Sequence, residues 1–368
     1  MKVTPWEVAG EIDYDKLMRE FGIDPFAKFS KALPDNVLFR RGIVYGQRDF
    51  QRIADCIKNK KEFVMMTGLM PSGKFHFGHK SLVDQIIFYQ SLGANVYIAV
   101  ADIEAYNMRN PNMEELKKTA IEEYLLNYIA LGLKPQNCDF YFQSARSNDA
   151  KLSNAYYKLA GLFARHATFN EMQAVYGELT PGRMTSSLLQ AADMFHPQLP
   201  EFGGPKPVVV PIGFDQDPHI RLARDIGQRI KEYSFIQLSS TYHKFAVGLK
   251  GGKMSSSDPT SYIALTDTPE EAAAKIRKHA FSGGRATAAE QKKLGANPEI
   301  DVSYQWLWEF FEPDDKKLRQ IHDDYKSGAM LTGELKELLI GKVTAFLREH
   351  QRKREQARKQ VDKFLKAD

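Results

Sequence analysis

The chain has 368 residues, of which 43% are hydrophobic and 26% charged, a composition typical of globular proteins with room for two or three domains. Its 51 basic and 46 acidic residues give a formal net charge of +5, which permits a polyanionic partner without requiring one. The opening segment lacks the apolar core of a signal peptide, and no stretch approaches the roughly 18 apolar residues of a membrane span. We therefore expect no association with a membrane.

The chain contains only two cysteines, Cys56 and Cys138. They lie far apart and lack the spacing of metal ligands, so they predict two buried thiols in a reducing compartment. We therefore expect a cytoplasmic protein without a structural metal.

Residues 1 to about 60 have a mostly helical pattern, with breaks at Pro25 and Pro34. The apolar run 63-FVMMT-67 then predicts a buried strand. A turn at Pro71, Ser72 and Gly73 follows, and apolar residues at helical spacing begin at Leu82. The order is therefore strand, turn and helix, which in a parallel sheet creates a favourable place for phosphate.

His76 and His79 lie on either side of Gly78 in this turn. A glycine there allows a flat ligand such as a nucleobase to approach the backbone closely. The histidines could donate hydrogen bonds to phosphate oxygens, although capping or packing of the helix is a second interpretation.

Further elements follow in chain order. The segment 94-ANVYIAVAD-102 predicts a second buried strand that ends near Asp102 and Glu104. Residues from about 111 to 195 are mostly helical in pattern, and 207-PVVVPIG-213 predicts a return to the sheet. Asp217 is predicted to cap the next helix, with Pro218 at its first position.

The segment 250-KGGKMSSSDP-259 combines glycines, a lysine and three serines. Such a composition suits a flexible linker, but Lys253 beside several hydroxyls and backbone donors also suits a polyphosphate. Beyond Pro259 the pattern is helical, with a predicted core at 304-YQWLWEFF-311. The basic end, 342–368, is compatible either with a solvated helix face or with RNA contact.

Two segments carry a resemblance to the class I aminoacyl-tRNA synthetases. The sequence His76-Phe77-Gly78-His79 resembles their HIGH signature, and 253-KMSSS-257 resembles KMSKS with serine at the fourth place. The resemblance narrows to the tryptophanyl-tRNA synthetases of the archaeal and eukaryotic kind. It is carried by the segments 5–8, 13–22, 213–230, 279–285 and 324–336.

This resemblance implies an α/β fold: a Rossmann-type parallel sheet that binds nucleotide, with a helical insertion and an α-helical C-terminal domain. The expected domains are an N-terminal helical extension over 1–60, a catalytic domain over 61–260 and an anticodon-binding domain over 261–368. The family would place a dimer interface in the insertion, about 111–195, so we expect a homodimer.

The implied reaction is ATP-dependent activation of L-tryptophan, followed by transfer to the 3′ end of tRNA(Trp). By resemblance, His76, His79, Lys253 and Ser255 are catalytic, and Mg²⁺ accompanies ATP. The implied ATP-binding residues are Pro71, Ser72, Gly73, Gly78, Gly213, Asp215, Lys253 and Met254. The implied tryptophan-binding residues are Met66, Gly68, Glu104, Gln190, Asp193 and Gln216. Phe281 and Arg285 are the implied anticodon contacts, although a core position for Phe281 is equally compatible with the sequence.

Three positions depart from the eukaryotic pattern. Met66 stands where the eukaryotic enzyme offers a tyrosine to the indole, and Ala99 where it offers a glutamine. Asp193, on the same helix face as Gln190, is therefore the expected acceptor for the indole N–H, unless it faces solvent or makes a structural hydrogen bond. Ala286 replaces an aspartate that touches the anticodon, which leaves that contact open.

Three alternatives remain. A tyrosyl-tRNA synthetase would also use an aspartate near position 193, but archaeal ones place a tyrosine at the position of Met66. A small-molecule nucleotidyltransferase carries similar signatures, but it would lack the helical region after Pro259. A non-catalytic RNA-binding paralogue should have lost one signature, and both are present.

Overall fold

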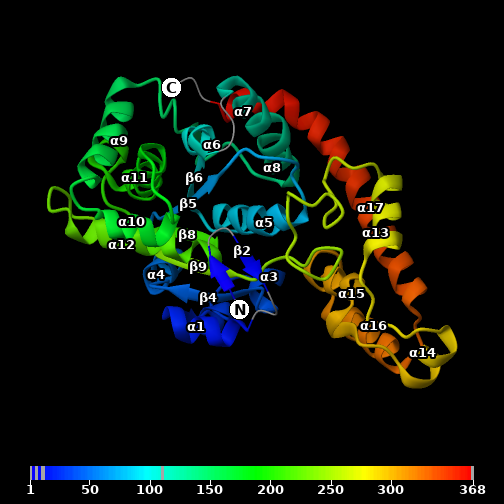
Figure 1. Ribbon diagram of the computed structural model, residues 1–368. Coiled ribbons are helices and arrows are strands. Elements are labelled where there is room, and N and C mark those ends of the chain that lie inside the picture. The colour runs from blue at the N-terminus through cyan, green and yellow to red at the C-terminus, as the bar shows by residue number, and fades with distance from the viewer. Residues whose placement is uncertain (1, 5–6, 10–12, 109–111, 366–368) are drawn as a thin grey trace. The chain divides into compact units, whose positions relative to one another are not determined.

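The computed structural model describes residues 2–4, 7–9, 13–108 and 112–365 (Figure 1). Pro5 and Trp6 of the segment 5–8, Pro111 at the start of the predicted insertion and the last three residues lie outside this set. The chain divides into two compact units. The first unit contains residues 1–72, 82–244 and 359–368, and the second contains residues 73–81 and 245–358.

The first unit is built on a seven-stranded sheet. Its strand order is β3 (Asp24–Pro25), β4 (Val44–Arg48), β9 (Ser239–His243), β8 (Val208–Gly213), β5 (Val64–Leu69), β6 (Asn95–Val100) and β7 (Cys138–Phe142). Strands β9 to β7 run parallel, whereas β3 and β4 add antiparallel pairings at one edge. A separate two-stranded sheet pairs β1 (Lys2–Thr4) antiparallel with β2 (Glu7–Ala9). The predicted class, a parallel sheet combined with many helices, is confirmed.

The chain order of these strands creates a switch point. Strands β5, β6 and β7 proceed toward one edge, and the chain then returns to place β8 on the opposite side of β5. Ligands of open α/β sheets bind beyond the carboxyl ends of the strands at such a point. The residues after β5, β6, β7 and β8 are therefore the ones placed for a ligand.

Helices of the first unit surround this sheet. Four of them, α9 (Ala150–Phe163), α10 (Phe169–Tyr176), α11 (Pro181–Phe195) and α12 (Asp217–Arg229), pack together, and α11 also contacts β5 and β8 (Figure 1). The others are α1 (Tyr14–Phe21), α2 (Ala27–Ser30), α3 (Val37–Arg40), α4 (Gln51–Asn59), α6 (Asp102–Met108), α7 (Met113–Thr119) and α8 (Leu126–Leu131), with a π-helical stretch at Ala120–Leu125. Helix α5 (Phe77–Ser91) begins in the second unit.

The second unit is helical. It contains α13 (Pro269–His279), α14 (Ala288–Leu294), α15 (Val302–Trp306), α16 (Asp315–Ser327) and the 26-residue α17 (Thr332–Ala357). Helix α13 packs along α17, and the fully buried Trp306 donates its indole N–H to the Val247 carbonyl at 2.7 Å. The aromatic run predicted to form a core therefore does so at Trp306, and the predicted helical C-terminal region is confirmed.

Besides the two- and three-residue strands β1, β2 and β3, three longer strands were not predicted. β4 lies in the region 1–60 that has a helical pattern, and β7 interrupts the predicted helical insertion. β9 also went unrecognised. Each has only five residues, too few to show a clear period, so pairing with neighbouring strands decides its structure.

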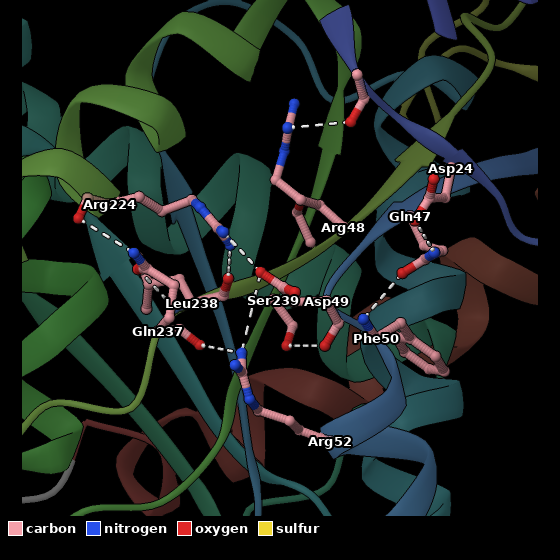
Figure 2. Close-up of polar contacts among 12 residues, drawn as sticks. Asp24, Gln47, Arg48, Asp49, Phe50, Arg52, Arg224, Gln237, Leu238 and Ser239 are labelled. Atoms are coloured by element: carbon pink, nitrogen blue, oxygen red, sulfur yellow. Dashed lines mark hydrogen bonds and ion pairs between the residues drawn. The ribbon is translucent and has the colours of Figure 1, made fainter. Parts of the chain in front are cut away.

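The turn between β4 and α4 is tied to the start of the neighbouring strand β9 by the contacts drawn in Figure 2. Asp49 has a positive φ of 54°, and its carboxylate accepts from Arg224 Nη2 at 2.6 Å. Its carbonyl accepts from Ser239 Oγ at 2.7 Å, while Arg224 also binds the Leu238 carbonyl. The turn thus holds the start of β9 in register with β4.

The predicted role of Asp217 as an N-cap is wrong. Asp217 is the first residue of α12, and Gln216 occupies the cap position without a side-chain cap bond. The Asp217 carboxylate instead accepts from Arg48 Nη2 at 2.9 Å and from the Tyr242 hydroxyl. A buried carboxylate needs such partners, and β4 and β9 supply them.

Candidate active site

The turn that contains His76 and His79 is locked by its own side chains. The Gly78 N–H donates to His76 Nδ1 at 3.2 Å, and the His76 N–H donates to His79 Nδ1 at 3.2 Å. The two imidazole rings lie 3.9 Å apart between centroids. A Cβ added at Gly78 would stand 3.0 Å from the His76 ring, so this position favours glycine.

These contacts define the protonation of both rings. Because Nδ1 of each ring accepts a backbone N–H, the proton of each neutral ring resides on Nε2. Burial, with the neighbouring His79, lowers the pKa of His76 to about 2, and burial lowers the pKa of His79 to about 4. Both histidines are therefore neutral near pH 7 and offer a single N–H donor each, rather than a positive charge.

The serine-rich loop of the second unit packs against this turn. His76 Nε2 lies 3.0 Å from Ser256 Oγ, and the Gly78 N–H donates to Met254 Sδ at 3.1 Å. These contacts join residues that are far apart in the sequence, by 180 positions for His76 and Ser256 and by 176 positions for Gly78 and Met254. A phosphate-binding site formed by both signature segments requires that they lie side by side, and these contacts show that they do.

Within the loop, Lys253 is exposed and its Nζ lies 4.0 Å from the centroid of the Phe245 ring. Ser255 Oγ lies 2.8 Å from Ser257 Oγ, and the Ser255 N–H donates to Ser261 Oγ at 3.2 Å. The loop therefore presents a cation and several hydroxyl groups together, a set suited to a polyphosphate.

In the first unit, polar residues follow the parallel strands. Gly68 is an exposed residue in the otherwise buried β5, and an added Cβ there would lie 3.9 Å from the Ala99 carbonyl oxygen. Glu104 and Asp102 begin α6 directly after β6, and both are buried. The Asp102 carboxylate binds Ser144, which follows β7, through its backbone N–H at 3.1 Å and its hydroxyl. The ends of neighbouring strands are thus tied together.

Gln190 belongs to a second polar group. Its Oε1 accepts from the Tyr176 hydroxyl at 3.0 Å, and that hydroxyl lies 3.1 Å from His219 Nδ1. Burial raises the pKa of Tyr176 well above 10, with a further contribution from Glu104, and burial lowers the pKa of His219 to about 4. Because Tyr176 supplies the donor, the Gln190 amide presents its N–H₂ group away from it.

Asp193 is buried in α11 and is held by three donors. Its Oδ1 accepts from the hydroxyls of Tyr141 at 2.7 Å and Tyr156 at 2.8 Å, and its Oδ2 accepts from Gln143 Nε2 at 2.7 Å. Burial raises the pKa of Asp193 to about 6, although these hydrogen bonds and Arg146 oppose the rise. Of the interpretations open from the sequence, a solvent-facing carboxylate is excluded.

The remaining predicted residues are placed as follows. Met66 and Ala99 are buried in β5 and β6. Pro71 is buried, Ser72 accepts from the Tyr124 hydroxyl through its carbonyl at 2.6 Å, and Gly73 has a φ of 68°. Gly213 ends β8, and Asp215 and Gln216 lie in the 3₁₀ turn that follows.

Phe281 and Arg285 belong to the second unit. Phe281 is 49% exposed, so it is not a core residue, and Arg285 is exposed with its Nε donating to the Gly295 carbonyl at 3.1 Å. An exposed aromatic ring and an exposed guanidinium group are each able to stack on an unpaired base.

Sequence reasoning missed several residues of these groups: Tyr141, Gln143, Tyr156, Tyr176, His219 and Ser256. Tyr141 and Gln143 lie on or next to the unpredicted β7, whose alternating side chains would have indicated that they share a face. In the sequence, Ser256 stands out only as the serine at the fourth place of the KMSKS-like segment.

Three further observations concern metals, thiols and membranes. The described residues contain no group of three or more His, Cys, Asp or Glu side chains that could hold a metal ion. Cys56 and Cys138 are buried free thiols, as predicted. No helix in the described ranges is both long and apolar enough to cross a membrane.

The chain is similar to known proteins over almost its full length. Residues 58–348 match the family described as tRNA synthetases class I (W and Y). The tryptophan–tRNA ligase of Aeropyrum pernix is 45% identical over 363 residues, covering 97% of this chain and 96% of the relative. That of Methanocaldococcus jannaschii is 45% identical over 371 residues, covering 99% and 98%. The crystal structure of the A. pernix tryptophanyl-tRNA synthetase has a TM-score of 0.90 at 44% identity and covers 98% of each chain. The sheet with its switch point, the joined signature segments and these similarities show that the chain belongs to the class I tRNA synthetases of the tryptophan and tyrosine group.

Proposed function

We propose that the chain is a tryptophan–tRNA ligase that activates L-tryptophan with ATP and transfers it to tRNA(Trp). The observation that carries this proposal is the contact between His76 and Ser256, which joins the two signature segments within one unit. The relatives at 45% identity, which are named tryptophan–tRNA ligases, support the choice of amino acid.

In the first step, a tryptophan carboxylate oxygen attacks the α-phosphorus of ATP, a bond to that phosphorus forms, and pyrophosphate leaves. Such a reaction depends mainly on positioning and on stabilising charge. Lys253 and Ser255 are proposed to meet the departing pyrophosphate. Near neutral pH, His76 and His79 contribute N–H donors without charge. His76 would exchange its Ser256 partner for a phosphate oxygen, which frees the serine hydroxyl for the same anion.

Other residues are proposed to hold ATP. Gly78 would admit the adenosine close to the backbone, and Met254 packs against it. The remaining members of the proposed ATP site are Pro71, Ser72, Gly73, Gly213 and Asp215. Mg²⁺ is proposed to arrive with the phosphates, since this ion is commonly held by substrate phosphates and only one or two carboxylates.

The amino-acid end is proposed to lie at the carboxyl edge of the sheet in the first unit. Gly68 is exposed and has no side chain to oppose the rings, and Met66 and Ala99 supply apolar surface. Glu104, Gln190 and Gln216 are proposed to bind the polar groups of tryptophan. The Tyr176 contact supports Gln190, because it turns the amide N–H₂ toward a free acceptor such as a carboxylate.

In the second step, a hydroxyl of the terminal tRNA adenosine attacks the activated carbonyl and AMP leaves. The 2′-hydroxyl, the usual class I acceptor, is proposed for this role.

Phe281 and Arg285 are proposed to contact the anticodon, supported by their exposure. A homodimer and a cytoplasmic location also belong to this proposal, the latter supported by the two free thiols. The domain boundaries at about 60 and 260 remain predictions.

ATP–pyrophosphate exchange with each of the twenty amino acids tests the proposed activity. Tryptophan should support the fastest exchange by a wide margin. Faster exchange with tyrosine would replace the proposal by a tyrosyl-tRNA synthetase, and no exchange with any amino acid would indicate a non-catalytic relative.

A further inference from the structure

Gln143 is a buried residue directly after β7, with 1% of its surface exposed. Its side-chain Nε2 donates to Asp193 Oδ2 at 2.7 Å. Among the residues that the structure describes, its Oε1 has no hydrogen-bond partner. Its main chain is fixed, because its N–H donates to the Val100 carbonyl at 3.0 Å and its carbonyl accepts from the Tyr157 hydroxyl at 2.6 Å.

The orientation of the Gln143 amide is determined by its neighbour. An ionised carboxylate only accepts hydrogen bonds, so the amide must turn its N–H₂ group toward Asp193. A flipped amide would set oxygen against oxygen. Tyr141 and Tyr156 keep the carboxylate in place, and burial raises the pKa of both well above 10, so they remain neutral donors. Oε1 is thereby held as a preorganised acceptor on the other side of the amide.

The sheet places this acceptor with the proposed tryptophan residues. Ala99 of β6 pairs with Gly68 of β5 on one side and with Tyr141 of β7 on the other. Gln143 follows Tyr141 by two residues, at the carboxyl end of the same parallel set. Asp193, which binds it, lies on α11, the helix that also carries Gln190 and contacts β5.

We propose that Gln143 Oε1 accepts the indole N–H of tryptophan and that Asp193 is a positioning residue that orients the amide. The inference rests on the proposed function. It fits the ligand because an indole has one donor and a buried acceptor without a donor is costly. Asp193 itself already receives three donors, whereas Gln143 Oε1 receives none among the described residues.

The test compares tryptophan with the benzothiophene analogue, in which sulfur replaces the indole N–H. Gln143→Leu should weaken binding of tryptophan by about tenfold to a hundredfold, while binding of the analogue changes by less than about threefold. Gln198→Leu is the matched control. Gln198 is equally buried, but its amide is satisfied by both the N–H and the carbonyl of Ile236, at 2.8 and 2.9 Å. Gln198→Leu should therefore not alter the ratio of the affinities for tryptophan and for the analogue.

A second pair of variants tests the role of Asp193. In Asp193→Asn, the new amide oxygen serves the two tyrosines and its N–H₂ faces Gln143, so the glutamine must flip and offer a donor to the indole. This variant should lose tryptophan binding to about the same extent as Gln143→Leu. In Asp193→Asn with Gln143→Glu, the asparagine donates to one glutamate oxygen, and the other oxygen again faces the indole. This double variant should regain tryptophan affinity.

The outcomes separate the inference from the proposed function. Equal losses for tryptophan and the analogue in Gln143→Leu, or no loss for either, would overturn the inference while leaving the proposed function intact. Failure of the wild-type protein to bind tryptophan would remove the function itself. If Gln143→Leu does not fold, the ratio of the affinities for tryptophan and for the analogue is compared between Asp193→Asn and the double variant with Gln143→Glu. A double variant that does not regain tryptophan affinity would contradict the inference.

Discussion

The buried carboxylate of Asp193 should make the stability of the first unit depend on pH. Its pKa is raised from 3.8 to about 6, mainly because burial disfavours the charged form. The folded protein therefore binds this proton more tightly than the unfolded chain does. The corresponding stabilisation is fully present below pH 3.8 and is lost as the pH rises through about 6.

The size of this effect follows from the shift. The full difference corresponds to about 3 kcal/mol, of which about 1.4 kcal/mol lies between about pH 5 and about pH 7.5. Asp193→Asn removes the titrating group but keeps an amide of the same shape. The free energy of unfolding of the wild type relative to this variant should thus be higher at about pH 5 than at about pH 7.5 by about 1.4 kcal/mol.

Hydrogen exchange of peptides from β7 and α11, corrected for the intrinsic effect of pH on exchange, measures this difference where Asp193 lies. Folding lowers the pKa of buried histidines such as His219 from 6.5 to about 4, so they also change the stability in this range, where they titrate in the unfolded chain. They are present in both proteins, so their contribution cancels in the comparison. If the free energy of unfolding changed with pH identically in the wild type and in Asp193→Asn, the reasoning that burial raises the pKa of this carboxylate would be refuted.

Three further predictions concern catalysis, RNA and assembly. Lys253→Ala should lower the rate of adenylate formation by about 10²-fold or more with little change in tryptophan binding, whereas Lys250→Ala, in the same loop, should have little effect; unchanged pre-steady-state activation would remove Lys253 from the mechanism. Phe281→Ala should weaken tRNA binding by about 1 to 3 kcal/mol, and Arg285→Ala should slow charging at limiting tRNA, as measured across tRNA concentrations. Wild-type tRNA affinity in the first variant and wild-type charging rates in the second would contradict the assignment of these residues to the anticodon. Light scattering at micromolar concentration should return twice the chain mass of 41.9 kDa, and a single chain mass would contradict the dimer.

Parts of the fold could be predicted because the sequence signal was long and local. The buried strands β5, β6 and β8 come from continuous apolar runs that end at glycine or at acidic residues, as a parallel sheet requires. Short strands such as β4 and β7 could not be predicted, because five residues do not establish a period and their pairing partners are distant.

The candidate site shows the same division. Gly78 and the histidines around it were recognisable because their chemistry depends on a local spacing. The surroundings of Asp193 were not, because its donors Tyr141, Gln143 and Tyr156 lie 52, 50 and 37 residues away in the sequence. Asp193 could be identified from its helix face, but whether it meets the substrate or another side chain depends on tertiary packing.

Transfer of labelled amino acids to tRNA tests the proposed function most directly, because it requires both chemical steps and the choice of both substrates. With unfractionated tRNA and ATP, the wild-type protein should charge tryptophan to the extent set by the content of tRNA(Trp), and it should charge no tyrosine under the same conditions. Charging of tyrosine, or release of pyrophosphate without any charged tRNA, would contradict the account.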